Sequence, residues 1–155
     1  MGLKTLFYPT RPHQKDMKIV FDKDNFMIAS TLKKTPKLDW VLFDKIKNKV
    51  MGEKYELSLT FIGKKRMRDL NRTHREKDYT TDILSFPLDD LKEKSQMGEI
   101  FIDIDKANQK SKDFERTPKN YLMFLFIHGL FHLKGHDHGD KMEKKEMEVR
   151  NLFGI

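Results

Sequence analysis

The 155-residue chain contains no cysteine. This absence excludes disulfide bonds, zinc sites with thiolate ligands, iron–sulfur clusters and enzymes that use a cysteine nucleophile. A transition-metal site in this chain must therefore be built from histidine, of which there are six, and from carboxylates.

The chain also lacks an apolar run long enough to cross a bilayer. Its most apolar stretch covers residues 121–133, whereas a spanning helix needs about 20 residues. No segment has the basic start, apolar middle and small-residue cleavage site of a signal peptide. We therefore expect a cytoplasmic protein.

No repeat and no linker divides the sequence, so we expect one domain over residues 17–155 after a loose leader at residues 1–16. Strand patterns cover residues 18–21, 55–61, 82–87 and 99–105, while residues 26–32 are ambiguous. Helical patterns cover residues 36–52, 64–72, 106–114, 118–133 and 140–151. This order predicts a single α+β domain, with a mixed four-stranded sheet packed against helices.

Four histidines fall within residues 128–138. His128 and His132 are one helical turn apart, so both imidazoles leave the same face of the helix. A lone histidine on an apolar helix is usually a core residue, but two on a buried helix both need polar partners. Gly135 is a natural end for this helix, and a reversal there could bring His138 back towards the other two.

The resulting spacing, HxxxHxxGxxH, is that of the metzincin zinc peptidases. In such sites three histidines hold zinc and leave a fourth position for water, whose pKa falls to about 7. The pattern therefore predicts a metal site, with His128, His132 and His138 as the candidate ligands. His136 could replace His138, but two residues earlier it should point elsewhere, so we place it behind the ligands or facing the substrate.

One part of the peptidase pattern is missing. Zinc peptidases carry a glutamate directly after the first histidine as general base, and this chain has Gly129 there. Asp137 is a candidate for orienting a ligand or handling a proton, although a solvated aspartate in a turn explains it equally well.

The motifs resemble those of the YbeY-type bacterial endoribonucleases, which act in ribosomal RNA maturation. The family pattern HGxLHLxGxDH is met, with Phe131 in place of leucine, by His128, Gly129, His132, Leu133, Gly135, Asp137 and His138. A second block, NxxYRxxDxPTDVLSFP, is matched by Asn71, Arg75, Asp78, Thr81, Asp82, Leu84, Ser85, Phe86 and Pro87. In this block His74, Thr80 and Ile83 depart from the usual residues.

The resemblance implies a metal-dependent hydrolase specific for single-stranded RNA, with a zincin-like metal-binding helix and one zinc ion per chain held by His128, His132 and His138. It places the family's functional arginine at Arg75, whose guanidinium can bind phosphate through two hydrogen bonds and stabilise charge on a phosphorane. It also implies ribosomal RNA, the small ribosomal subunit and its assembly factors as partners. The implied roles are processing of the 3′ end of small-subunit ribosomal RNA and ribosome quality control.

The charge balance is consistent with an RNA partner. The chain has 31 lysines and arginines against 24 acidic residues, a net charge of +7, and basic residues are densest over residues 64–77. We expect backbone contacts to RNA from Lys64, Lys65, Arg68 and Arg72. A merely solvated basic helix is the alternative.

Two other functions stay open at this point. A zinc peptidase-like hydrolase would use the same three histidines, although Gly129 counts against it. A ribosome-associated RNA-binding protein would use zinc for folding alone and would bind RNA without cleaving it. For an endoribonuclease, either water or the RNA 2′-hydroxyl could be the attacking group.

Overall fold

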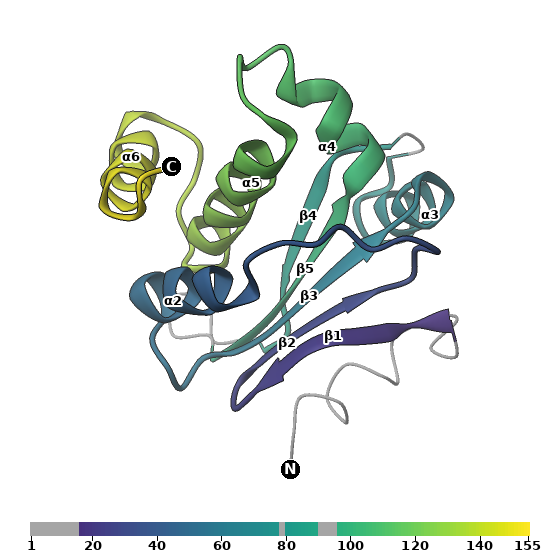
Figure 1. The fold of residues 1–155 in the computed structure, drawn as a ribbon, viewed down its shortest axis with the longest axis horizontal. Helices are drawn as coiled ribbons and strands as arrows, with labels where there is room; N and C mark the ends of the chain where they lie inside the picture. Colours follow the sequence, from purple (N-terminus) through teal and green to yellow (C-terminus); the bar gives the residue numbers. More distant parts are fainter. Residues whose placement is uncertain (1–15, 78–79, 90–95) are drawn as a thin grey trace.

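The structure is a computed structural model that describes residues 16–77, 80–89 and 96–155. Within these residues the chain forms one mixed sheet, with the strand order β1-β2-β3-β5-β4 (Figure 1). The strands are β1 (Lys18–Lys23), β2 (Phe26–Ser30), β3 (Glu56–Ile62), β4 (Ile83–Pro87) and β5 (Met97–Asp103). The three inner strands run parallel, and the edge strands β1 and β4 run antiparallel to their neighbours. Except for Asp16, the leader predicted for residues 1–16 lies outside the described residues.

The sheet has five strands, so the prediction of four was wrong. The additional strand is β2, which lies between β1 and β3 and is buried along its whole length. A strand that is buried on both faces has no alternation of apolar and polar residues, and a short apolar run can equally be part of a helix. That is why residues 26–32 fitted neither pattern.

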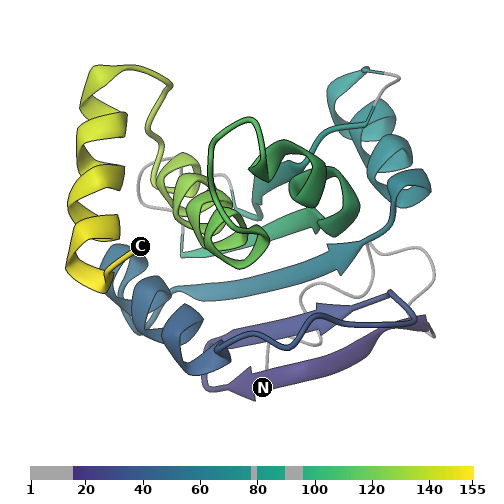
Figure 2. The same cartoon turned by 45° about the horizontal axis from the view of Figure 1, so that its top comes forward.

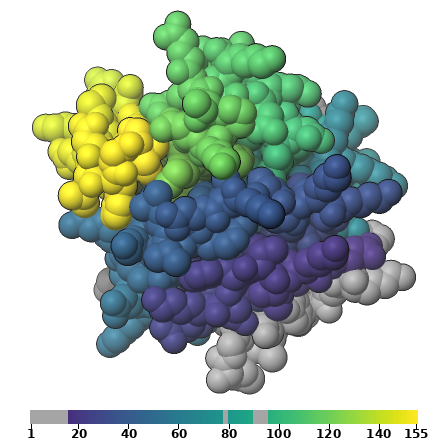
Figure 3. All heavy atoms as spheres, viewed as in Figure 1, coloured from purple at the N-terminus to yellow at the C-terminus, as the bar shows by residue number. Residues whose placement is uncertain are grey.

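Five helices pack around the sheet in the described part of the chain. They are α2 (Trp40–Met51), α3 (Lys64–Arg75), α4 (Ile104–Ser111), α5 (Pro118–Leu133) and α6 (Asp140–Phe153). Figures 1 and 2 show α5 lying across one face of the sheet between α2 and α4, with α6 on its outer side. The space-filling view shows α2, α5 and α6 in continuous contact on this face (Figure 3).

A threonine followed by the proline at residue 36 predicted a helix that begins at residue 36. Helix α2 instead begins at Trp40. The carboxylate of Asp39 accepts a hydrogen bond from the Leu42 N–H at 3.1 Å and so provides the N-cap. By contrast, α5 begins where predicted, with Thr117 as N-cap and Pro118 in the first turn.

Helix α5 is the centre of the main core. Phe126 on this helix packs against Phe43 of α2 and Phe26 of β2, with ring centroids 4.9 and 5.8 Å apart. Apolar residues surround α5. The helix is therefore stabilised by burial on nearly all of its sides rather than along a single apolar stripe. None of the described helices is both long and apolar enough to span a bilayer.

Helix α3 packs on the opposite face of the sheet. Its Met67 lies in a small separate cluster with Leu84 and Phe101, whereas Ile83 and Ile100 belong to the main core under α5. Successive residues of a strand point to opposite faces, so the two clusters lie on either side of the sheet. The basic helix and the histidine helix are thus separated by β4 and β5.

Candidate functional site

The three histidines predicted to bind metal converge. His128 and His132 lie on the last turns of α5, and His138 lies in the loop that leads to α6. One ring nitrogen of each lies within 4.8 Å of the others, and the Nε2 atoms of His128 and His132 are 3.0 Å apart. Gly135 has a φ of +90°, a conformation that glycine adopts without strain, and it reverses the chain as predicted. Three imidazoles that point at one another form a donor set suited to a transition-metal ion such as zinc.

The protonation state of His132 favours metal binding. Burial lowers the pKa of His132, and the neighbouring His128 and His138 lower it further, while a hydrogen bond with the backbone of His136 opposes the shift. A lowered pKa keeps the imidazole neutral at neutral pH. A neutral imidazole has the lone pair that a metal ion requires.

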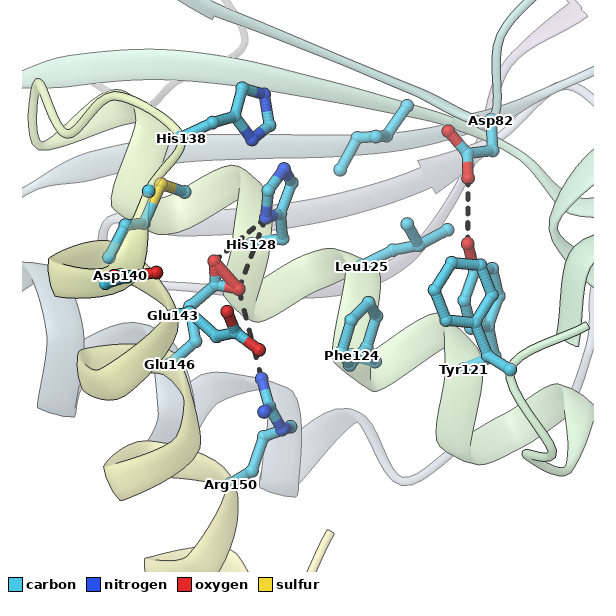
Figure 4. A pocket seen from close by; sticks show the side chains of 14 residues that line it. Asp82, Tyr121, Phe124, Leu125, His128, His138, Asp140, Glu143, Glu146 and Arg150 are labelled. Atoms are coloured by element: carbon cyan, nitrogen blue, oxygen red, sulfur yellow. Dashed lines mark hydrogen bonds and ion pairs between the residues drawn. The ribbon is translucent and has the colours of Figure 1, made fainter.

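A buried carboxylate fixes the orientation of His128. The two carboxylate oxygens of Glu146, on α6, lie 2.9 and 3.2 Å from His128 Nδ1 (Figure 4). Donation from Nδ1–H to this carboxylate leaves Nε2 as the lone-pair nitrogen that faces the other histidines. This role of Glu146 was not predicted from the sequence. A signal was present, because Glu146 interrupts the apolar stripe of α6 between Met142 and Val149.

We expect Glu146→Ala to lower zinc affinity by about 10- to 100-fold, the usual cost of losing a partner that orients a ligand. Glu146→Gln should lose less, because an amide oxygen can still accept the hydrogen bond from His128. Competition with a zinc-binding dye measures both affinities. Glu143→Gln, an exposed change one turn earlier on α6, serves as the control, and an unchanged affinity in Glu146→Ala would contradict the assignment.

Gly129 allows α5 to lie close against the sheet. A Cβ atom at this position would lie 2.9 Å from Ile83 Cδ1, 3.0 Å from Ser85 Oγ and 3.1 Å from Ile100 Cδ1. The glutamate that serves as the base of zinc peptidases therefore does not fit after His128. The missing base has a structural cause in this chain, namely the packing of α5 on β4 and β5.

Gly129→Glu should consequently destabilise the protein. Overpacking a close contact costs roughly 1–3 kcal/mol, and the buried carboxylate adds to that cost. Urea unfolding measures the change. Gly63→Glu is the matched control because the nearest atom to a Cβ there, on Leu32, is 3.9 Å away; equal stability of the two variants would show that α5 is not closely packed at Gly129.

Arg75 lies at the end of α3, beside the edge strand β4. Its Nη2 donates a hydrogen bond to the Ser85 carbonyl oxygen at 3.3 Å, and its guanidinium carbon lies 5.7 Å from the centre of the Phe86 ring. Ser85 Oγ lies on the other side of the strand, against Gly129. The exposed guanidinium of Arg75 and the backbone of Gly129 therefore lie on opposite sides of the strand β4.

The other predicted site residues do not join the three histidines. The ring of His136 packs 5.5 Å from that of Phe131, and Asp137 is exposed in the loop. Besides Arg75, the exposed lysines and arginines of α3 are Lys64, Lys65, Arg68 and Arg72. Arg72 pairs with Asp69 at 2.9 Å. Asp78, part of the second motif, lies outside the described residues.

A cavity of about 390 Å³ opens beside the histidines, between α5, α6 and the start of β4 (Figure 4). His128 and His138 line one end, and Tyr121, Phe124 and Arg150 line the other. The hydroxyl of Tyr121 donates to Asp82 at 3.1 Å, and the burial of this pair raises the pKa of Tyr121. No local pattern in the sequence predicts this cavity, because its lining comes from three separate elements.

Comparisons with known proteins agree with the motifs. A family model described as Endoribonuclease YbeY matches residues 21–152. The Endoribonuclease YbeY of Alkaliphilus metalliredigens is 41% identical over 102 residues, which are 62% of this chain and 66% of that protein. That of Finegoldia magna is 37% identical over 110 residues, which are 66% of this chain and 72% of that protein.

A solved structure supports the fold. The solution structure of TM1509 from Thermotoga maritima matches with a TM-score of 0.57 and 22% identity, over 83% of this chain and 89% of that one. The predicted α+β fold class, family and enzyme class are therefore confirmed. Because the family model covers most of its length, this chain belongs to the Endoribonuclease YbeY family.

Proposed function

We propose that this protein is a zinc-dependent endoribonuclease that cleaves single-stranded RNA and acts in the cytoplasm on ribosomal RNA. The observation that carries the proposal is the convergence of His128, His132 and His138 in a chain of an endoribonuclease family. The donor set fits zinc because it consists of imidazoles alone, one of which is oriented by a carboxylate. One ion per chain would bind there.

A bound zinc ion would supply Lewis-acid chemistry, which polarises a phosphoryl oxygen or activates water. The chain's own residues prepare the site for it. Glu146 holds the Nδ1 proton of His128, and the lowered pKa of His132 keeps that imidazole neutral. The left-handed backbone at Gly135 returns His138 to the other two histidines.

Arg75 is our candidate for the group that neutralises charge on the reacting phosphate. Its guanidinium is exposed at the edge of β4. A hydrogen bond to the backbone carbonyl of Ser85 and a contact with the ring of Phe86 fix the position of the guanidinium. Charge that develops on a phosphorane is stabilised best by a donor that is already in place. Ser85 of β4, which accepts the hydrogen bond from Arg75, also lies against Gly129 of α5.

The exposed basic face of α3 is suited to bind the phosphate backbone of RNA. The helix ends at Arg75, so RNA bound along it would extend towards that residue. We propose that Lys64, Lys65, Arg68 and Arg72 contact phosphates, and that the substrate is ribosomal RNA in the small subunit and its assembly intermediates. The family resemblance supports processing of the 3′ end of this RNA and ribosome quality control as the biological roles.

Removing two of these charges should change the salt dependence of RNA binding. Each phosphate contact on a single strand contributes about −0.7 to the slope of log K against log salt, so Lys64→Gln with Lys65→Gln should make the slope shallower by about 1.4. Lys45→Gln with Lys49→Gln removes the same charge from exposed positions on α2 and should leave the slope unchanged. Equal slopes in the two variants would contradict the assignment of α3.

Metal analysis combined with RNA cleavage tests the function. The purified protein should contain one zinc ion per chain, cleave a single-stranded ribosomal RNA fragment, lose cleavage on chelation and regain it with zinc. Products ending in a 2′,3′-cyclic phosphate would assign the attack to the RNA 2′-hydroxyl. Stoichiometric zinc and RNA binding without cleavage would establish an RNA-binding protein instead, and cleavage of peptides without cleavage of RNA would establish a peptidase.

A further inference from the structure

The end of the cavity away from His138 has an aromatic wall. Phe114, in the connection between α4 and α5, is 52% exposed and packs 5.2 Å from the ring of Tyr121 at an interplanar angle of 30°. Tyr121 in turn stacks on Phe124 at 5.6 Å and 15°. All three side chains line the cavity. Phe114 therefore presents a half-exposed aromatic ring in the lining of this cavity.

A buried guanidinium lies in the same wall. Arg150 is only 8% exposed, and its guanidinium carbon lies 4.9 Å from the centre of the Phe124 ring. Its Nη1 has no hydrogen-bond partner among the residues that the structure describes, and the closest ion-pair contact, with Glu146 Oε2, is 3.9 Å long. Buried donors are rarely left without a partner in native proteins, so an unpartnered donor in a cavity wall indicates a ligand with an acceptor group.

The charges of the cavity indicate what kind of ligand this is. The carboxylates that line it outnumber the guanidinium and belong to Asp82, Asp140, Glu143 and Glu146. Such a lining offers several hydrogen-bond acceptors and one strong donor group to a ligand. It suits a neutral aromatic group that offers N–H donors to carboxylates and an acceptor to arginine, and unpaired nucleobases have these groups on their edges.

We propose that this cavity binds one unpaired nucleobase of the RNA substrate, stacked on the exposed face of Phe114. The acceptor edge of the base faces Arg150, and its exocyclic amino group faces the carboxylate of Asp82, which lies at the same end of the cavity as Tyr121. The subsite therefore prefers guanine, adenine or cytosine to uracil. This inference rests on the proposed endoribonuclease function and adds a binding determinant to it.

The subsite is close enough to the three histidines for one RNA strand to contact both. Tyr121 and His128 are seven residues apart on α5, which corresponds to about 10 Å along the helix axis. A stacked strand rises about 3.4 Å per nucleotide. The bound base therefore belongs to a nucleotide within about three positions of the reacting phosphate, while the basic face of α3 holds the backbone elsewhere.

Single-stranded RNA oligomers with one abasic nucleotide at successive positions around the cleavage site test the proposal. Stopped-flow binding to the zinc-loaded protein gives the affinity before cleavage proceeds. For the wild type we expect one position at which loss of the base weakens binding by about tenfold, the effect of one base–aromatic stack. Uridine at that position should bind several-fold more weakly than guanosine, adenosine or cytidine.

Variants of Phe114 connect that position to the cavity. Phe114→Leu keeps an apolar side chain without a ring and should remove the position dependence, whereas Phe114→Trp should keep it. Leu152→Ala, which truncates another apolar side chain that is 60% exposed and does not line the cavity, should behave as the wild type.

Two results would overturn the subsite while leaving the proposed function intact. They are RNA cleavage with equal affinity for all abasic oligomers, and a position dependence that persists in Phe114→Leu. A wild-type protein that neither binds nor cleaves RNA would overturn the proposed function and the subsite together.

Discussion

Replacing His132 with alanine is expected to abolish zinc binding and RNA cleavage together. The change removes one of three converging imidazoles, and loss of an orienting partner alone already costs 10- to 100-fold in metal affinity. We therefore expect affinity to fall by more than about 100-fold. Metal analysis of the purified variant and cleavage of a single-stranded ribosomal RNA fragment measure the two losses.

Thermal unfolding provides a second measurement. A metal ion at 100 times its dissociation constant stabilises the folded state by about 2.7 kcal/mol, so added zinc should raise the melting temperature of the wild type. The His132→Ala variant should show no such increase.

His136→Ala is the control for this prediction. It removes an imidazole that packs against Phe131 and lies outside the group of three, so zinc content and cleavage should be retained. Full cleavage by His132→Ala without bound metal would refute the metal centre. Loss of zinc from His136→Ala but not from His138→Ala would assign the third ligand to His136.

Arg75→Ala should lower the rate of RNA cleavage by about 100- to 1000-fold, as expected for the loss of a donor that stabilises charge in the transition state. Zinc content and melting temperature should not change, because the side chain is exposed and lies on the surface of β4. Arg75→Lys should recover a small part of the rate, since an ammonium group keeps the charge but loses the planar fork.

Arg72→Ala, which removes an exposed arginine from the same helix, is the matched control. Its guanidinium is paired with Asp69, so we expect a change of only a few-fold in cleavage, mainly through RNA binding. Equal rates for Arg75→Ala and the wild type, at saturating RNA, would exclude a role for Arg75 in the chemical step.

The convergence of the three histidines could be predicted because they are neighbours in the sequence. His128 and His132 are fixed by the geometry of one helix, and the chain reversal depends on Gly135, which directly precedes the loop containing His138. Local backbone rules are sufficient to bring these three residues together. The second motif likewise contains both Arg75 and the strand that it contacts.

The remaining parts depend on tertiary packing, which no local pattern encodes. Glu146 meets His128 only because α6 folds back along α5, and Arg150 lies against Phe124 for the same reason. The strand β2 was missed because burial on both faces removes the polar residues that mark a strand. The prediction of four strands thus failed where the sheet is most deeply buried.

The position of α5 in the chain has a consequence for biogenesis. The apolar face that carries Ile28, Leu59 and Ile100 is covered by a helix that is synthesised after all five strands. Because a nascent chain emerges N-terminus first, this face lacks the cover of α5 until residue 133 has left the ribosomal exit tunnel. The same helix carries His128 and His132, so closing the hydrophobic core and adding two of the three converging histidines are a single late event in the life of the nascent polypeptide.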